Sequence, residues 1–119
     1  MNETPGKEDL KAEIDRGHFA RAALLASSLG LPEDQIRDLR RRALWQMAAV
    51  FRNAAGTKIL AQQYGLSKND LQKILEKYAE EKKNDRNDKA LEPCYEQATG
   101  KYLSFEEWMD HLLKNFDKL

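Results

Sequence analysis

Only one cysteine, Cys94, occurs among the 119 residues, so the chain forms no internal disulfide. The sequence also lacks any apolar run as long as a membrane-spanning helix. Its start does not have the basic-then-apolar layout of a signal peptide. Together these absences favour a cytoplasmic protein without a membrane partner.

Catalytic and metal-binding patterns are missing as well. The two histidines, His18 and His111, do not stand at metal-ligand spacing. There is no glycine-rich phosphate loop and no nucleophile elbow. A run that begins at residue 85 resembles a calcium loop only in part, because Lys89 takes a ligand position and Ala90 stands where glycine is needed. We therefore expect no enzyme, no metal site and no cofactor.

Net charge is zero, but it is unevenly distributed. Charged residues (34%) and apolar residues (41%) are in the proportions of a globular protein, and the length suits one helical domain over residues 1–119. Residues 36–89 carry 13 lysines and arginines against 7 acidic residues, whereas residues 1–35 carry 4 against 7 and residues 90–119 carry 3 against 6. A basic middle suits a polyanionic partner, although charges paired locally along solvated helices explain the same pattern.

Glycines divide the N-terminal part into helices. Residues 1–6 are expected to be disordered, although Thr4-Pro5 suits the start of a first helix that ends near Gly17. A second helix is expected over residues 19–29, and Gly30 stops it.

A long third helix is expected from Pro32 to about Arg52, with Glu33 and Asp34 favourably placed at its start. Gly56 then separates it from the next helix. The apolar positions of the third helix make a stripe broad enough for burial on more than one side. They are Ile36, Leu39, Ala43, Met47 and Val50, widened by Leu44, Ala48 and Phe51.

The C-terminal part changes character twice. Residues 82–93 are polar without apolar period, which predicts an exposed loop. Residues 94–103 favour a small hairpin or a wide turn around Thr99-Gly100. Residues 104–117 predict a helix that caps the core, opened by a Ser104–Glu107 capping box. Its apolar face is Phe105, Trp108, Met109, Leu112, Leu113 and Phe116. The fold class is therefore all-α, with about six helices.

The most informative stretch is residues 57–78. Its small and apolar residues have the spacing with which two helices meet at a tight corner, namely Ala61, Gly65, Leu71 and Ile74. Gly65 suits the left-handed conformation that stops the first helix, and Ser67 with Asp70 forms a capping box for the second. The side chains expected to fill the corner are Leu60, Tyr64, Leu66, Leu71 and Ile74.

The same pattern occurs thirty-five residues earlier. The matching residues there are Ala26, Gly30, Ile36 and Leu39, and further pairs are Leu24/Ile59, Leu25/Leu60, Leu29/Tyr64 and Leu31/Leu66. A repeat of this length is typical of stacked helical hairpins. In the first copy, Glu33 and Asp34 open the second helix and would repel phosphate, so that copy is expected to be structural.

Residues 57–78 resemble the helix-turn-helix motif of DNA-binding proteins, without indicating a particular family. The resemblance implies that the helix opened by Ser67 lies in the major groove. Its outward residues would be Lys68, Asn69, Gln72 and Lys73, since asparagine and glutamine pair with adenine and lysine reaches guanine or phosphate. Lys58, Arg40, Arg41 and Arg52 would contact backbone phosphates. Asp70 and Glu76 on the same helix oppose this reading.

The alternative is an all-α protein-interaction module in which both corners are purely structural. Grooves between helices accept a partner's amphipathic helix, and tryptophans such as Trp45 and Trp108 are enriched at binding hot spots. Helix-turn-helix proteins usually act as dimers, and Phe105, Trp108 and Phe116 are candidates for a homodimer contact, although a role in the core suits them better.

Overall fold

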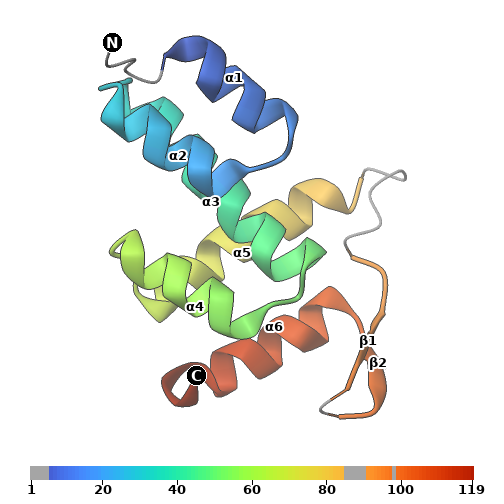
Figure 1. Ribbon diagram of the computed structural model, residues 1–119. Coiled ribbons are helices and arrows are strands. Elements are labelled where there is room, and N and C mark those ends of the chain that lie inside the picture. Colours follow the sequence, from blue (N-terminus) through green and yellow to red (C-terminus); the bar gives the residue numbers. More distant parts are fainter. Residues whose placement is uncertain (1–5, 85–90, 98) are drawn as a thin grey trace. The chain divides into compact units, whose positions relative to one another are not determined.

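The computed structural model describes residues 6–84, 91–97 and 99–119 (Figure 1). These residues form six α-helices and, as their only sheet, one pair of short strands. The all-α class is therefore confirmed. None of the helices in the described part of the chain is both long and apolar enough to cross a membrane. Backbone contacts divide the chain into two compact units, residues 1–46 and 47–119. The expectation of one helical domain over residues 1–119 stays a prediction.

The first unit contains three helices, α1 (Lys7–Asp15), α2 (Phe19–Ser28) and α3 (Glu33–Trp45). α2 packs against both α1 and α3. Gly6 is the N-cap of α1, and Gly17 ends that helix with a φ of 75°. The other residues of the expected disordered start, 1–5, lie outside the described residues. The core of this unit is built from Leu10, Ala22, Ala23, Ala26, Ile36 and Leu39.

The boundary between the units lies within a π turn, η1 (Gln46–Val50), so the second unit begins with the last four residues of that turn. Its elements are α4 (Ala54–Gln63), α5 (Lys68–Lys82), β1 (Cys94–Glu96), β2 (Lys101–Leu103), α6 (Phe105–Lys114) and the 3-10 turn η2 (Phe116–Lys118). Most of the expected polar loop over residues 82–93 lies at residues 85–90, outside the described part.

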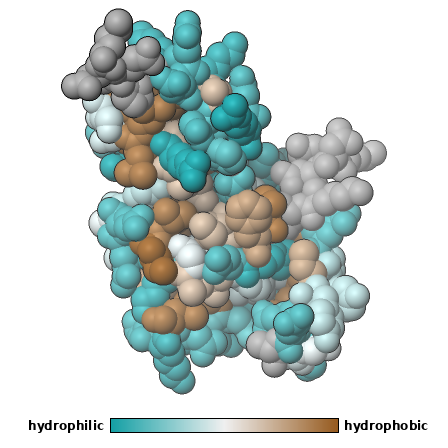
Figure 2. All heavy atoms as spheres, in the orientation of Figure 1, coloured by the Kyte–Doolittle hydropathy of each residue, from teal (hydrophilic) through white to brown (hydrophobic). Residues whose placement is uncertain are grey.

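The 35-residue repeat is confirmed in the backbone. α2 and α4 begin and end thirty-five residues apart, and so do the starts of α3 and α5. Gly30 and Gly65 have φ values of 67° and 70°, and both helices end in the same pair of hydrogen bonds. Apolar side chains appear among hydrophilic ones on the face of the molecule shown in Figure 2. The equivalent residues Leu24 and Ile59 are 69% and 54% exposed.

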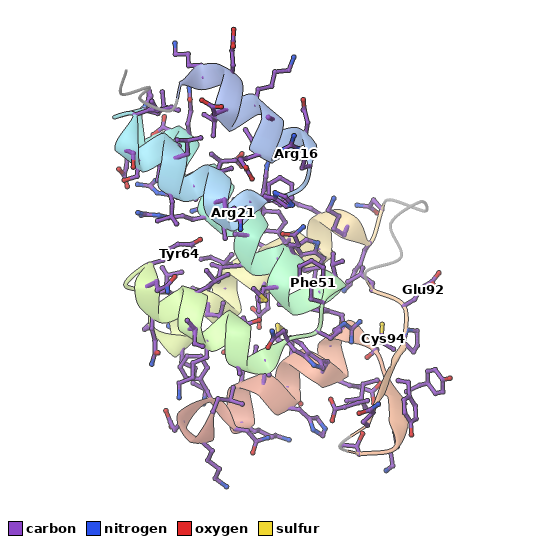
Figure 3. The ribbon with its side chains drawn as sticks, in the orientation of Figure 1. Arg16, Arg21, Phe51, Tyr64, Glu92 and Cys94 are labelled. Carbon is purple, nitrogen blue, oxygen red and sulfur yellow. The ribbon has the colours of Figure 1, made fainter. Side chains whose placement is uncertain are left out.

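The long third helix departs from its predicted course. It is α-helical only to Trp45 and then forms the π turn η1. A π turn holds an additional residue, so the side chains that follow are rotated away from the α-helical stripe. The predicted burial of Val50 and Phe51 is therefore wrong, since they are 57% and 60% exposed; Phe51 is labelled in Figure 3.

Gly56 does not separate two helices, as the sequence suggested, because it lies inside the first turn of α4. Its backbone N–H donates to Oδ1 of the N-cap residue Asn53 at 2.8 Å. A Cβ on Gly56 would lie 2.8 Å from both Nδ2 of Asn53 and Sδ of Met47. A glycine is therefore required at position 56 because these two side chains lie so close to its backbone, and not because the helix ends there.

The C-terminal elements are found where they were predicted, except that the expected helix over residues 104–117 ends at Lys114 and Phe116 lies in η2. β1 and β2 form an antiparallel hairpin in which Cys94 pairs with Leu103 and Tyr95 with Tyr102. α6 follows directly, with the Ser104–Glu107 capping box in place. The residues of its expected apolar face are all buried, namely Phe105, Trp108, Met109, Leu112, Leu113 and Phe116. Burial makes Trp108 a core residue, and Trp45 is likewise only 6% exposed.

Candidate nucleic-acid interface

The corner between α4 and α5 is closed by backbone hydrogen bonds at its tip. Gly65 N–H donates to the Gln62 carbonyl at 3.1 Å, and Leu66 N–H donates to the Ala61 carbonyl at 2.9 Å. These two bonds form a Schellman motif, which satisfies the last carbonyls of α4. Ala61 is fully buried beneath the corner. The tight turn therefore delivers the chain to the start of α5 in a fixed direction.

The capping box at the start of α5 is present. The Asp70 carboxylate accepts from the Ser67 N–H at 3.0 Å, and the Ser67 hydroxyl accepts from the Asp70 N–H at 3.1 Å. The hydrogen bonds from Ser67 lower the pKa of Asp70. The Asp70 carboxylate therefore caps α5, which explains why one acidic residue stands on the helix that was expected to enter the major groove.

Three of the four predicted base-contacting residues are exposed. Lys68, Asn69 and Lys73 lie on the open face of the first turns of α5. Gln72 is half-buried, and its Nε2 donates to Glu76 Oε1 at 2.8 Å. Lys77, which the sequence analysis did not single out, is also exposed, and its spacing of four residues from Lys73 places it on the same helical face.

Lys58 is held by the C-terminal residues. Its Nζ donates to the Leu119 carbonyl at 2.9 Å and lies 5.3 Å from the centre of the Phe116 ring. An ammonium over an aromatic face is attracted by the ring quadrupole, whose negative potential lies on that face. Lys58 therefore fastens η2 to α4, and a phosphate contact would have to compete with this arrangement.

Arg52 is the predicted phosphate contact that the geometry supports least. Its guanidinium joins the end of η1 to the hairpin and to the start of α6. It donates to four carbonyls, those of Ala49 (3.1 Å), Leu103 (3.3 Å), Ser104 (3.4 Å) and Glu92 (3.1 Å). Glu92 lies on the segment leading into β1 (Figure 3).

Aromatic rings complete the Arg52 site. The guanidinium carbon lies 5.5 Å from the centre of the Phe105 ring and 5.9 Å from that of Trp108. Burial lowers the pKa of Arg52 from its ordinary value. A guanidinium with this many partners inside the fold favours a structural role over the phosphate contact expected from sequence.

The remaining predicted phosphate contacts lie in the first unit. Arg40 and Arg41 are both half-buried on α3. On the same helix, Arg42 pairs with Asp38 at 3.0 Å. Among the predicted site residues of the second unit, the exposed ones are Lys68, Asn69 and Lys73.

The C-terminal half of α5 has the opposite electrostatic character. Between it and α6 lies a cavity of about 570 Å³, with Ala79 and Met109 among its lining residues. Five carboxylates line it, those of Glu76, Glu80, Glu106, Glu107 and Asp110. Lys83 bridges the two helices, at 3.3 Å from Glu106 and 3.4 Å from Glu80, and these bonds raise its pKa. A polyanion is repelled here, so this end of α5 is unfavourable for contact with a phosphate backbone.

The two copies of the repeat differ in charge at equivalent positions. Glu33 and Asp38 in the first copy correspond to Lys68 and Lys73 in the second, and all four residues are exposed. They also differ in packing, because the backbones of α2 and α3 approach each other much more closely than those of α4 and α5.

Comparison of the chain with protein-family models, with curated proteins and with solved structures finds no match. In the described part of the chain, no three histidine, cysteine, aspartate or glutamate side chains gather as a metal ion requires.

Proposed function

We propose that this chain binds double-stranded DNA through the N-terminal half of α5. The observation that carries the proposal is the exposed group Lys68, Asn69 and Lys73, presented immediately after a capped, tight corner. Lysine supplies charge for phosphate or guanine, and asparagine pairs with adenine.

Helix stability does not explain Lys68. This residue occupies the first position of α5, where the helix dipole is positive and an acidic residue is preferred. The equivalent residue of the first copy, Glu33, is acidic, as the helix dipole favours. A cation at this position works against the helix and is accounted for by an anionic partner.

The other predicted residues take secondary roles in this proposal. Gln72 reaches a base only if its hydrogen bond to Glu76 is exchanged, and Lys58 only if its bond to Leu119 is exchanged. Arg40 and Arg41 remain candidates for phosphate contact from the first unit. Lys77 extends the basic face of α5 by one turn.

The test is an NMR titration of labelled protein with a short random duplex, first at low salt and then at raised salt. We expect salt-sensitive shifts clustered on Lys68, Asn69, Lys73 and Lys77, because phosphate contacts release counterions. Absence of shifts at low salt, or shifts that ignore the salt concentration, would reject the proposal.

A matched pair of variants separates a specific face from net charge. Lys68→Ala with Lys73→Ala should weaken DNA binding and reduce the slope of log affinity against log salt by about 2. Lys7→Ala with Lys11→Ala removes the same charge from α1 and should leave the slope near that of the unchanged protein. Equal effects of both pairs would mean that only the overall charge matters.

A second candidate function is a protein-interaction module in which the corners are structural. Burial of Trp45 and Trp108 removes the aromatic hot spots that the sequence offered. One observation still favours this candidate, an apolar groove in the first unit. Homodimerisation through Phe105, Trp108 and Phe116 would require exposing core side chains, and it stays a prediction.

A further inference from the structure

Arginines gather in the second half of α3. Four of the six residues from 37 to 42 are arginines, and Asp38 is the one acidic residue among them. Asp38 is already neutralised, because Nε of Arg42 lies 3.0 Å from its carboxylate. α2 and α3 together carry five arginines against three acidic residues. The acidic start of α3, at Glu33 and Asp34, is therefore followed by a basic stretch.

Arg37 and Arg41 stand one helical turn apart, on the same face of α3. Arg37 is exposed and Arg41 is half-buried. Neither side chain has an ion-pair partner among the residues that the structure describes. Like charges at this spacing destabilise a helix. The stability of α3 does not explain this pair of arginines.

The second copy of the repeat shows that the fold does not require arginines at these positions. The equivalent residues, thirty-five positions later, are Gln72 and Glu76 on α5. They form a complementary pair, in which Nε2 of Gln72 donates to Oε1 of Glu76 at 2.8 Å. The first copy has two side chains of equal charge at these positions. An anionic partner would compensate both charges.

The chemistry of arginine indicates which anion this partner carries. A guanidinium is planar and donates two parallel hydrogen bonds to a phosphate group, which the ammonium of lysine does not. A nucleic-acid backbone presents phosphates in a row, so two arginines on one helical face suit neighbouring contacts with it.

We propose that Arg37 and Arg41 form a second phosphate-binding surface for nucleic acid, on the first unit. This inference rests on the DNA binding proposed for α5 and adds a separate contact with the same class of partner. The first copy of the repeat was expected to be structural because Glu33 and Asp34 would repel phosphate. That repulsion applies to the first turn of α3, whereas the arginines begin one turn later.

The test uses the full chain and a labelled random duplex, with affinity measured by fluorescence anisotropy over a series of salt concentrations. Arg37→Gln with Arg41→Gln should reduce the slope of log affinity against log salt by about 2, because two phosphate contacts are lost. Arg37→Lys with Arg41→Lys should keep the slope but weaken binding, because lysine lacks the paired donors of the guanidinium.

Two further variants serve as controls. Lys7→Gln with Lys11→Gln removes two cations at the same spacing from exposed positions of α1, and should leave the slope unchanged. Arg37→Gln alone changes an exposed residue and should reduce the slope by about 1. It provides the answer if circular dichroism shows that the loss of half-buried Arg41 disturbs the fold.

The outcomes separate this inference from the function proposed for α5. An unchanged slope in Arg37→Gln and in the double variant would overturn the second surface, even where Lys68→Ala with Lys73→Ala shows that α5 binds DNA. A slope lost with the arginines but kept in the lysine variant would support this surface and reject the contact through α5. Equal losses in the arginine pair and the α1 pair would overturn the inference in favour of net charge. Absence of duplex binding by the unchanged protein would reject both.

Discussion

Gly17 and Arg52 stand thirty-five residues apart and both adopt positive φ, 75° and 49°. Each follows a helical segment and immediately precedes the N-cap of the next helix, His18 before α2 and Asn53 before α4. The repeat therefore begins before the corners that made it visible in the sequence. Glycine reaches this conformation freely, whereas arginine reaches it only at a free-energy cost.

The first prediction concerns the backbone strain at Arg52. Arg52→Ala keeps the positive φ but loses the hydrogen bonds to Leu103, Ser104 and Glu92, so it should destabilise the protein by about 2 to 4 kcal/mol. Arg52→Gly loses the same bonds but relieves the strain, and should be about 1 kcal/mol more stable than Arg52→Ala. Urea denaturation measures both.

The matching change in the first copy provides the control. Gly17→Ala introduces the strain without removing any side-chain bond, since a Cβ there would meet only Gln46 Nε2 at an ordinary 3.5 Å. It should cost about 1 kcal/mol. If Arg52→Gly were no more stable than Arg52→Ala, the strain would be negligible.

The second prediction reverses the usual rule for glycine in a helix. Helix propensity alone says that Gly56→Ala should stabilise α4 by about 1 kcal/mol. The new methyl group would collide with Asn53 and Met47 and displace the N-cap, so we expect a net loss of about 1 to 2 kcal/mol. Thermal denaturation gives the sign directly.

A double-mutant cycle tests the cause. Once Asn53→Ala has removed the cap, Gly56→Ala should cost clearly less than it does alone, because the colliding amide is gone. Additive effects would place the collision at Met47 instead.

Local signals in the sequence were sufficient for much of the fold. Gly30 and Gly65 end their helices by adopting a positive φ, which glycine does without help from distant residues. Ser67 and Ser104 each form a capping box with the residue three positions further along the chain. The 35-residue repeat and the hairpin at residues 94–103 follow from the same short-range chemistry. These features depend on neighbours in the chain, so one sequence reveals them.

Tertiary contacts decided what the sequence could not predict. No local pattern in the sequence marks the π turn at Gln46–Val50. This turn leaves Phe51 exposed, although the sequence predicted that it would be buried. Arg52 looked like any basic residue near a corner, but three of its four carbonyl partners, those of Glu92, Leu103 and Ser104, lie 40 to 52 residues further along the chain. Lys68, Asn69 and Lys73 are exposed, as expected for the start of a capped helix, whereas Gln72, which was expected to face outward with them, is half-buried.

The third prediction concerns acid stability. Hydrogen bonds from Ser67 lower the pKa of Asp70, and those from Ser104 lower the pKa of Glu107. A carboxyl group with a lowered folded-state pKa adds stability above its unfolded pKa, near 4, and that stability disappears as pH falls through the folded value. The midpoint temperature of thermal unfolding should therefore decrease as the pH is lowered below about 4. Asp70→Asn with Glu107→Gln should lower the midpoint at pH 7 and make it depend less on pH below about 4. If the loss of stability in acid were unchanged in this variant, other carboxylates would be its cause.

The fourth prediction exchanges charges between the two copies. Lys68→Glu with Lys73→Asp gives α5 the residues that α3 carries at Glu33 and Asp38. A glutamate at the first position of α5 suits the helix dipole by about 0.3 to 1 kcal/mol. An aspartate in place of Lys73 offsets this gain, because it is a poorer helix former and no longer attracts Asp70, so stability should change by less than about 1 kcal/mol. DNA affinity should nevertheless fall by at least tenfold at low salt, because two cations have become two anions. Denaturation and duplex titration of the same variant measure the two quantities. Loss of affinity without loss of stability assigns the lysines to a partner, whereas unchanged affinity would make the corner between α4 and α5 purely structural.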